Sequence, residues 1–305
     1  MASANPPQAG GPDCAAAVPR AVFKLAEETL LRRRTLPPDM HGAVAAALAQ
    51  AAGGAVPAQA AAAGQAIADA VAAFAASFGP AGEPAYHNQY HQAEATLAMG
   101  WLCAVACRLG LLGSEAAAGV LAMAGHDLQH DGSVPSPGAL EAHSAGLTVA
   151  LAAQAGLDEA MQATISRVIL ATDPRRGPVT QAPARHVGDD LLCRLVREAD
   201  LFGSLMPRLG WQLSQDLAQE LRVARCHPTT PVDSYAGRLQ LLSTLPSVSP
   251  PARELGLEDG VACQIAALAA LGDGDAARGA AVLDASPPAT ARAKYMAALA
   301  AVAGP

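Results

Sequence analysis

The apolar residues of this 305-residue chain recur mainly three and four positions apart, which is the spacing of one face of a helix. Residues 21–34 show this pattern and stop before a Pro-Pro pair. Residues 40–79 predict one or two Ala-rich helices with a break near Gly53-Gly54 and Pro57. Residues 79–84 predict a loop, and the chain changes character after it.

Beyond this loop we expect a series of helices separated by short Gly/Pro loops. The expected helices are 86–110, 114–130, 136–156, 157–173, 187–206, 211–226 and 232–245. Pro137 is expected at the first position of its helix, where its missing N–H costs little. Residues 247–254 predict a loop, and residues 257–303 predict two more Ala-rich helices around the turn at 272–275.

Composition agrees with an all-α fold, a compact multi-helix bundle. Hydrophobic residues make up 51% of the chain but aromatics only 3%, so alanine, the best helix former, carries much of the apolar share. Alanine also favours close backbone approach between helices. We expect a flexible tail over 1–20 and a single all-helical domain over 21–305, with helices packing on the rest in its N-terminal part, 21–80.

Charge and cysteine content narrow the function classes. A net charge of −7 argues against a general nucleic-acid binder, which would show a basic stripe. Six scattered cysteines without a CxxC pair favour reduced thiols. The start of the chain lacks the features of a secretion signal, and the most apolar stretches, 43–76 and 97–125, are interrupted by polar residues. We therefore expect a cytoplasmic protein with no membrane partner.

The histidines carry the most informative pattern. Only eight occur, and His87 and His91, like His126 and His130, are four residues apart, a spacing that places both imidazoles on one helix face. Asp127 directly follows His126. A single such histidine is most often a satisfied core residue, but this many polar groups in an apolar helix need partners. A mixed His/Asp set suits a divalent ion such as Zn²⁺, Mn²⁺, Fe²⁺ or Mg²⁺.

Four short motifs follow one another in a recognisable order. They are YHNxxH at 86–91, HDxxH at 126–130, ATD at 171–173 and ADL at 199–201. In this order they resemble the HD-domain phosphohydrolases and, more narrowly, the catalytic domain of class I cyclic nucleotide phosphodiesterases. The resemblance covers about residues 84–205. It implies a phosphodiesterase-like helical bundle with an HD-type metal core there and further helices over 206–305.

The resemblance also implies roles for individual residues. Two divalent metals are expected, with Asp127 bridging them, His87 as the general acid, and a metal-bridged hydroxide as nucleophile. Glu141 is expected to orient His87 by accepting a ring N–H, and Tyr86 to lie in the substrate site. The first metal's expected ligands are His91, His126, Asp127 and Asp200, and the residues expected to hold metal-bound waters are His130, Glu141 and Thr172.

Some of these roles have a simpler alternative. Glu141 could be an exposed helix-surface carboxylate, and Thr172 and Asp173 could merely end a helix before a proline. Gln264 matches the purine-binding glutamine of the family, but Ala267 stands where the family has an aromatic clamp. Because stacking on an aromatic side chain contributes about 1–3 kcal/mol per base, tight purine binding is in question, and Gln264 could equally lie on the surface.

The leading functional hypothesis is hydrolysis of a 3′,5′-cyclic nucleotide to the 5′-monophosphate. The first alternative is an HD phosphohydrolase acting on another phosphate ester, such as a nucleotide monophosphate or an organophosphate. The second is a degenerate HD domain that serves as a binding or regulatory module. The expected partner is a small phosphate-ester substrate, and the sequence leaves a homodimer open.

Overall fold

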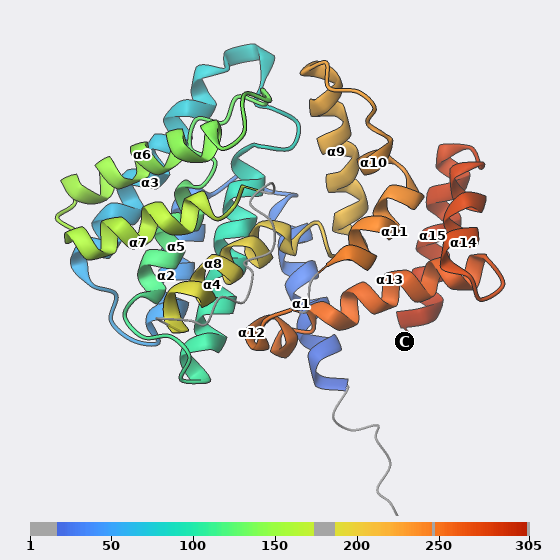
Figure 1. The fold of residues 1–305 in the computed structure, drawn as a ribbon, viewed down its shortest axis with the longest axis horizontal. Helices are drawn as coiled ribbons and strands as arrows, with labels where there is room; N and C mark the ends of the chain where they lie inside the picture. The colour runs from blue at the N-terminus through green and yellow to red at the C-terminus, as the bar shows by residue number, and fades with distance from the viewer. Residues whose placement is uncertain (1–16, 174–186, 246–247, 304–305) are drawn as a thin grey trace, which may run out of the picture.

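The computed structural model describes residues 17–173, 187–245 and 248–303. Every regular element in these residues is a helix, and none of them forms a strand. This confirms the predicted all-α class. In Figure 1, helices α2–α7 gather on one side, and α9–α11 and α13–α15 on the other, with α1 between them; α12 lies below α4.

The N-terminal helices are α1 (Ala17–Arg33), α2 (Met40–Ala52) and α3 (Ala58–Ser77), followed by a short 3₁₀ helix (Gly79–Ala81). The break predicted near Gly53 is present, because Gly53 ends α2 in the left-handed conformation with φ 57°. Helix α1 begins at Ala17, inside the segment 1–20 predicted as a tail, and residues 1–16 lie outside the described residues.

The central helices are α4 (Gln89–Arg108), α5 (Ala116–Gly125), α6 (Ala139–Gln154), α7 (Glu159–Leu170) and α8 (Val187–Phe202). Helix α4 starts later and α5 ends earlier than predicted, in both cases at the polar residues of the histidine motifs. Residues 86–88 precede α4, whose N-cap is Asn88, and residues 126–130 form turns after α5. Pro137 is not the first helical residue, because Gly138, with φ 73°, caps α6 instead.

Helix α4 lies at the centre of the core, and all of its residues from 91 to 100 are buried. It packs against α2, α5 and α8. Small residues allow the α2 contact: a Cβ on Gly100 would lie 2.6 Å from Ala47 Cα, which no side chain tolerates. The close backbone approach expected from the alanine content therefore holds at this crossing.

The C-terminal helices are α9 (Leu209–Val223), α10 (Thr230–Asp233), α11 (Tyr235–Thr244), α12 (Pro250–Glu254), α13 (Leu257–Leu271), α14 (Ala276–Asp284) and α15 (Pro288–Ala303). Two expectations were wrong. The predicted loop 247–254 contains α12, which Ser249 caps and Pro250 begins. The segment 257–303 holds three helices, because a turn at Ser286 and the prolines after it separate α14 from α15.

Helix α3 is the one helix of the described ranges whose length and composition would let it cross a membrane. One third of its most apolar window is buried inside the protein, where α3 packs on α2, α5 and α6. Core helices pass the same test, so this observation is weak evidence for a membrane span.

Candidate metal centre

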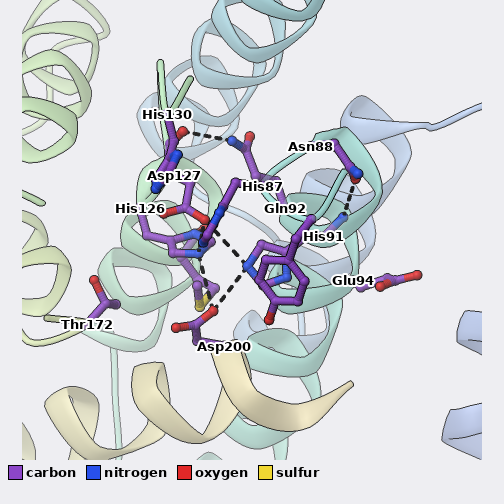
Figure 2. Close-up of polar contacts among 12 residues, drawn as sticks. His87, Asn88, His91, Gln92, Glu94, His126, Asp127, His130, Thr172 and Asp200 are labelled. Atoms are coloured by element: carbon purple, nitrogen blue, oxygen red, sulfur yellow. Dashed lines mark hydrogen bonds and ion pairs between the residues drawn. The ribbon is translucent and has the colours of Figure 1, made fainter. Parts of the chain in front are cut away.

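Four side chains predicted as metal ligands converge between three helices (Figure 2). His91 lies in the first turn of α4, Asp200 lies near the end of α8, and His126 and Asp127 directly follow α5. His91 Nε2 is 3.4 Å from Asp127 Oδ2 and 3.1 Å from Asp200 Oδ1. His126 Nε2 is 3.0 Å from Asp127 Oδ2 and 3.5 Å from Asp200 Oδ1.

The spacings among His91, His126 and Asp200 fit one divalent ion. Nitrogen and oxygen ligands lie about 2.1 Å from such an ion, so neighbouring ligand atoms are about 3.0 Å apart in an octahedron and about 3.4 Å in a tetrahedron. The ligand atoms of His91, His126 and Asp200 all lie within 4.8 Å of one another. Asp127 stands outside this trio, and Figure 2 shows it on the opposite side of the imidazole nitrogens from Asp200.

The contacts within the cluster leave its polar atoms without hydrogen bonds. His91 Nε2, His126 Nε2 and Asp127 Oδ2 are all buried and have no hydrogen-bond partner, despite their short mutual distances. An unpaired buried polar atom costs about 1–3 kcal/mol. A cation that accepts all of these lone pairs at once removes that cost, so the donor set fits a metal.

The electrostatics of the cluster also favour a bound metal. Burial lowers the pKa of both imidazoles, but the carboxylates of Asp127 and Asp200 outweigh it and raise the pKa of His91 to about 9 and that of His126 to about 10. Burial likewise opposes ionisation of the two carboxyls, yet the imidazoles hold their pKa values below the ordinary range. The two carboxylates thus form an anionic site in which a metal competes with protons.

Local structure orients the ligands. His126 Nδ1 lies 2.8 Å from the Met123 carbonyl oxygen, which accepts its hydrogen and leaves Nε2 to face the other ligands. Asn88 caps α4, with Oδ1 accepting from Tyr90 N at 3.0 Å and from His91 N at 3.2 Å. The cap fixes the first turn of α4 and, with it, the direction of His91.

His87, the predicted general acid, lies beside the cluster, but its partner differs from the predicted one. The structure pairs His87 Nδ1 with Glu220 Oε1, while Glu220 Oε2 accepts the backbone N–H groups of Tyr86 and His87, each at 2.9 Å. Burial opposes ionisation of Glu220, yet these bonds lower the pKa of its carboxyl. Glu220 is therefore an acceptor, and His87 Nδ1 carries the hydrogen.

Glu141 does not take the place predicted for it next to His87. It lies in the first turn of α6, and its buried Oε2 has no hydrogen-bond partner. Glu220 was missed because it lies 133 residues from His87 in the chain. The sequence did contain a clue to Glu220. It lies seven residues after Leu213, on the same buried face of α9, where a carboxylate is unusual unless it has a partner.

His130 stacks on His87, with ring centroids 3.9 Å apart and planes 12° from parallel. Its Nδ1 accepts from Gly132 N at 3.0 Å. Burial and the neighbouring His87 lower the pKa of His130 to about 4, so its ring is neutral at ordinary pH. The ligand atoms of His87, His130 and Glu220 also lie within 4.8 Å of one another, which makes them a second group able to hold a metal.

Thr172 lies to the side of Asp200 in Figure 2. Its hydroxyl donates to the Ile169 carbonyl at 2.7 Å, so it ends α7 in the way that the simpler alternative described. The next residue, Asp173, is buried. The predicted role of Thr172 toward a metal-bound water stays a prediction.

The two residues predicted to contact substrate are both buried. Tyr86 packs its ring 4.6 Å from that of His91, and its hydroxyl lies 3.2 Å from Ser204 Oγ. Gln264 has no exposed surface; its Oε1 accepts from Arg238 and its Nε2 donates to the Leu205 carbonyl at 2.6 Å. Because both ends of the Gln264 amide are bonded within the core, the structure gives it a packing role rather than a place on a pocket wall.

No protein-family model matches this sequence, and no curated protein matches it. Among solved structures, the phosphodiesterase domain of the RhoPDE fusion protein from the choanoflagellate Salpingoeca rosetta is similar, with 14% identity and a TM-score of 0.46 over 94% of this chain and 93% of that chain. A second structure of the phosphodiesterase domain of S. rosetta rhodopsin phosphodiesterase has 15% identity and a TM-score of 0.45, over 93% and 91%.

Proposed function

We propose that this protein is a metal-dependent phosphohydrolase that cleaves a phosphodiester, with a 3′,5′-cyclic nucleotide as the first candidate substrate. The observation that carries the proposal is the convergence of two imidazoles and two carboxylates beside a histidine that is held by its own carboxylate. His91, His126, Asp127 and Asp200 would hold the first metal, and we expect two divalent ions in all.

Divalent ions bound there would supply a nucleophile from water at neutral pH and offset negative charge on the phosphoryl group. The chain supplies the proton. Glu220 holds the Nδ1–H of His87, so a second proton, carried on Nε2, is the one that passes to the departing alkoxide oxygen and leaves His87 neutral. The neutral, stacked ring of His130 limits the directions that the His87 ring can take.

One observation favours another phosphate ester as substrate. Gln264 is withdrawn into the core, and Ala267, also fully buried, offers no aromatic face. Recognition of a purine would then need other residues. A nucleotide monophosphate or another organophosphate is therefore the second candidate.

The test uses the full chain purified with Mn²⁺. We expect loss of cyclic AMP or cyclic GMP with formation of the 5′-monophosphate, and no turnover by His91→Ala. The same panel should include a nucleotide monophosphate and bis(p-nitrophenyl) phosphate. Activity on these alone would replace the cyclic nucleotide but keep the enzyme class, whereas less than one metal per chain and no hydrolysis would favour a regulatory module.

A leaving-group comparison tests the role of His87. Cyclic nucleotides release a poor, alkoxide leaving group, whereas p-nitrophenolate departs without a proton. General acids contribute about 10²–10⁴-fold, so His87→Ala should slow the first reaction by that order and the second much less. Equal losses on both substrates would remove His87 from the role of acid.

A further inference from the structure

The turn that carries Asp127 is tied to neighbouring helices through its backbone. The last carbonyls of a helix lack partners within the helix, and here side chains from elsewhere supply them. Ser144 Oγ donates to the Leu128 carbonyl at 3.0 Å, and the Thr148 hydroxyl lies within hydrogen-bond distance of the Gly125 carbonyl, at 3.1 Å, and of the Ser144 carbonyl, at 2.7 Å. Both come from α6.

The carbonyl of Asp127 itself is bound by Gln92, whose Nε2 donates to it at 2.9 Å (Figure 2). Gln92 belongs to α4 and directly follows the ligand His91. Asp127 thus lies against two neighbouring residues of one helix: His91 Nε2 is 3.4 Å from its carboxylate, and Gln92 holds its main chain.

Only the NH2 group of the Gln92 amide forms a hydrogen bond. Gln92 is 5% exposed, and its Oε1 is buried without a hydrogen-bond partner, so the residue carries an unpaired acceptor into the core. A methionine would fill similar space without that cost. The feature that distinguishes glutamine here is the donor, which contacts the backbone of the ligand residue.

We propose that Gln92 is a positioning residue of the metal centre, which sets the direction of the Asp127 carboxylate by holding the Asp127 carbonyl and thereby raises metal affinity. The proposal rests on the proposed function only for the statement that the cluster binds a divalent ion.

The test is a titration of metal-free protein with Mn²⁺, followed by the electron paramagnetic resonance signal of free Mn²⁺. Gln92→Met keeps the shape and loses the donor, and Gln92→Glu provides a second variant that keeps a polar side chain. Loss of a group that orients a ligand typically weakens binding about 10–100-fold, and we expect a weakening of that size in both variants. The urea midpoint of metal-free Gln92→Met should change little, because the lost bond is offset by removal of the unpaired Oε1.

Two controls separate positioning from general loosening. Gln162→Met removes a comparable bond far from the cluster, where Nε2 donates to the Leu157 carbonyl at 2.7 Å. Ser144→Ala frees the Leu128 carbonyl of the same turn without touching Asp127. We expect both to keep Mn²⁺ affinity within about threefold of the wild type, below the range typical for a group that orients a ligand.

The outcomes are distinguishable. Wild-type-like Mn²⁺ affinity in both Gln92 variants would overturn the positioning role and leave the proposed function standing. An equal loss in Ser144→Ala would also overturn it, since any loosening of the turn would then suffice. Absence of Mn²⁺ binding by the wild type would overturn both proposals.

Discussion

Two regions of this protein bury polar side chains, and they do so in opposite ways. In the C-terminal helices, the fully buried Arg238 donates to the carbonyls of Ser204 and Met206 at 3.3 and 3.0 Å and to Gln264 Oε1. Gln264 in turn donates to Leu205. Most of the buried donors in this region have an acceptor. In the metal centre, imidazole nitrogens and carboxylate oxygens converge at 3.0–3.5 Å without forming hydrogen bonds.

The contrast shows which kind of buried polarity marks a binding site. Arg238 Nε and the Tyr235 hydroxyl also lack hydrogen-bond partners. A guanidinium nitrogen, however, has no lone pair to offer a cation, and the Tyr235 hydroxyl is one neutral oxygen without the carboxylate charge of the metal centre. In the metal centre the unpaired atoms all offer lone pairs, and they point at one another. Convergence of lone pairs, rather than burial alone, separates a ligand site from a packing network.

The largest expected effect comes from removing a ligand. Metal activation contributes several kcal/mol, and about 1.4 kcal/mol corresponds to a factor of ten, so His126→Ala should lower kcat/KM for the best substrate at least about 10³-fold. Metal content measured on the purified variant should fall with it. His143→Ala is the matched control, because His143 is exposed and bonds only the Gln129 side chain. A fully active His126→Ala would contradict the claim that the unpaired atoms of this region bind a metal.

The second largest effect is expected in the hydrogen-bond network around Arg238, which includes Ser204, Met206 and Gln264. Arg238→Met removes the donor to the Ser204 carbonyl and one of the two donors to the Met206 carbonyl and to Gln264 Oε1, which keep the Gly210 N–H and the Tyr295 hydroxyl. An unpaired buried group costs about 1–3 kcal/mol. We expect the free energy of unfolding in urea to fall by about 2–4 kcal/mol, with Mn²⁺ affinity of the folded protein unchanged. Arg222→Met, which loses only a surface pair with Asp233, should cost less than about 1 kcal/mol. A strong loss of metal affinity in Arg238→Met would show that the regions are coupled.

The two glutamates near His87 allow a comparison within the metal centre. Glu220→Gln keeps only one of the two accepting oxygens and removes the negative charge beside His87, so His87 Nδ1 and the two backbone N–H groups can no longer all be accepted. We expect about a 10²-fold slower release of an alkoxide leaving group with little effect on p-nitrophenolate release. Glu141→Gln should leave both rates within about threefold, which is below the loss typical for removing an orienting partner. The reverse result would restore the partner that the sequence predicted.

The smallest effect concerns two helix caps. Asn88→Ala and Asp158→Ala each remove a side-chain acceptor at a helix start and should each lower the unfolding free energy by about 1 kcal/mol. Only Asn88 precedes a ligand, so only Asn88→Ala should also weaken Mn²⁺ binding. Equal affinity in the two variants would mean that packing alone directs His91.

The outline of the molecule could be read from local patterns. Apolar spacing and the Gly and Pro positions predict most of the helices, because both act within a few residues along the chain. Helix ends near the site were less predictable. Tyr86 to Asn88 and His126 to His130 leave the helical pattern because their backbone groups bond to Glu220, Gln92 and turn partners instead.

The candidate ligands were named from short motifs, and the tertiary structure brings them together. By itself, the sequence determined the helical class, the order of the helices and the residue types able to hold a metal. The tertiary structure alone decided that Glu220, rather than Glu141, fixes His87, that Gln92 holds Asp127, and that Gln264 lies in the core. Helical periodicity reports neighbours three or four residues apart, whereas these contacts arise from the packing of distant helices.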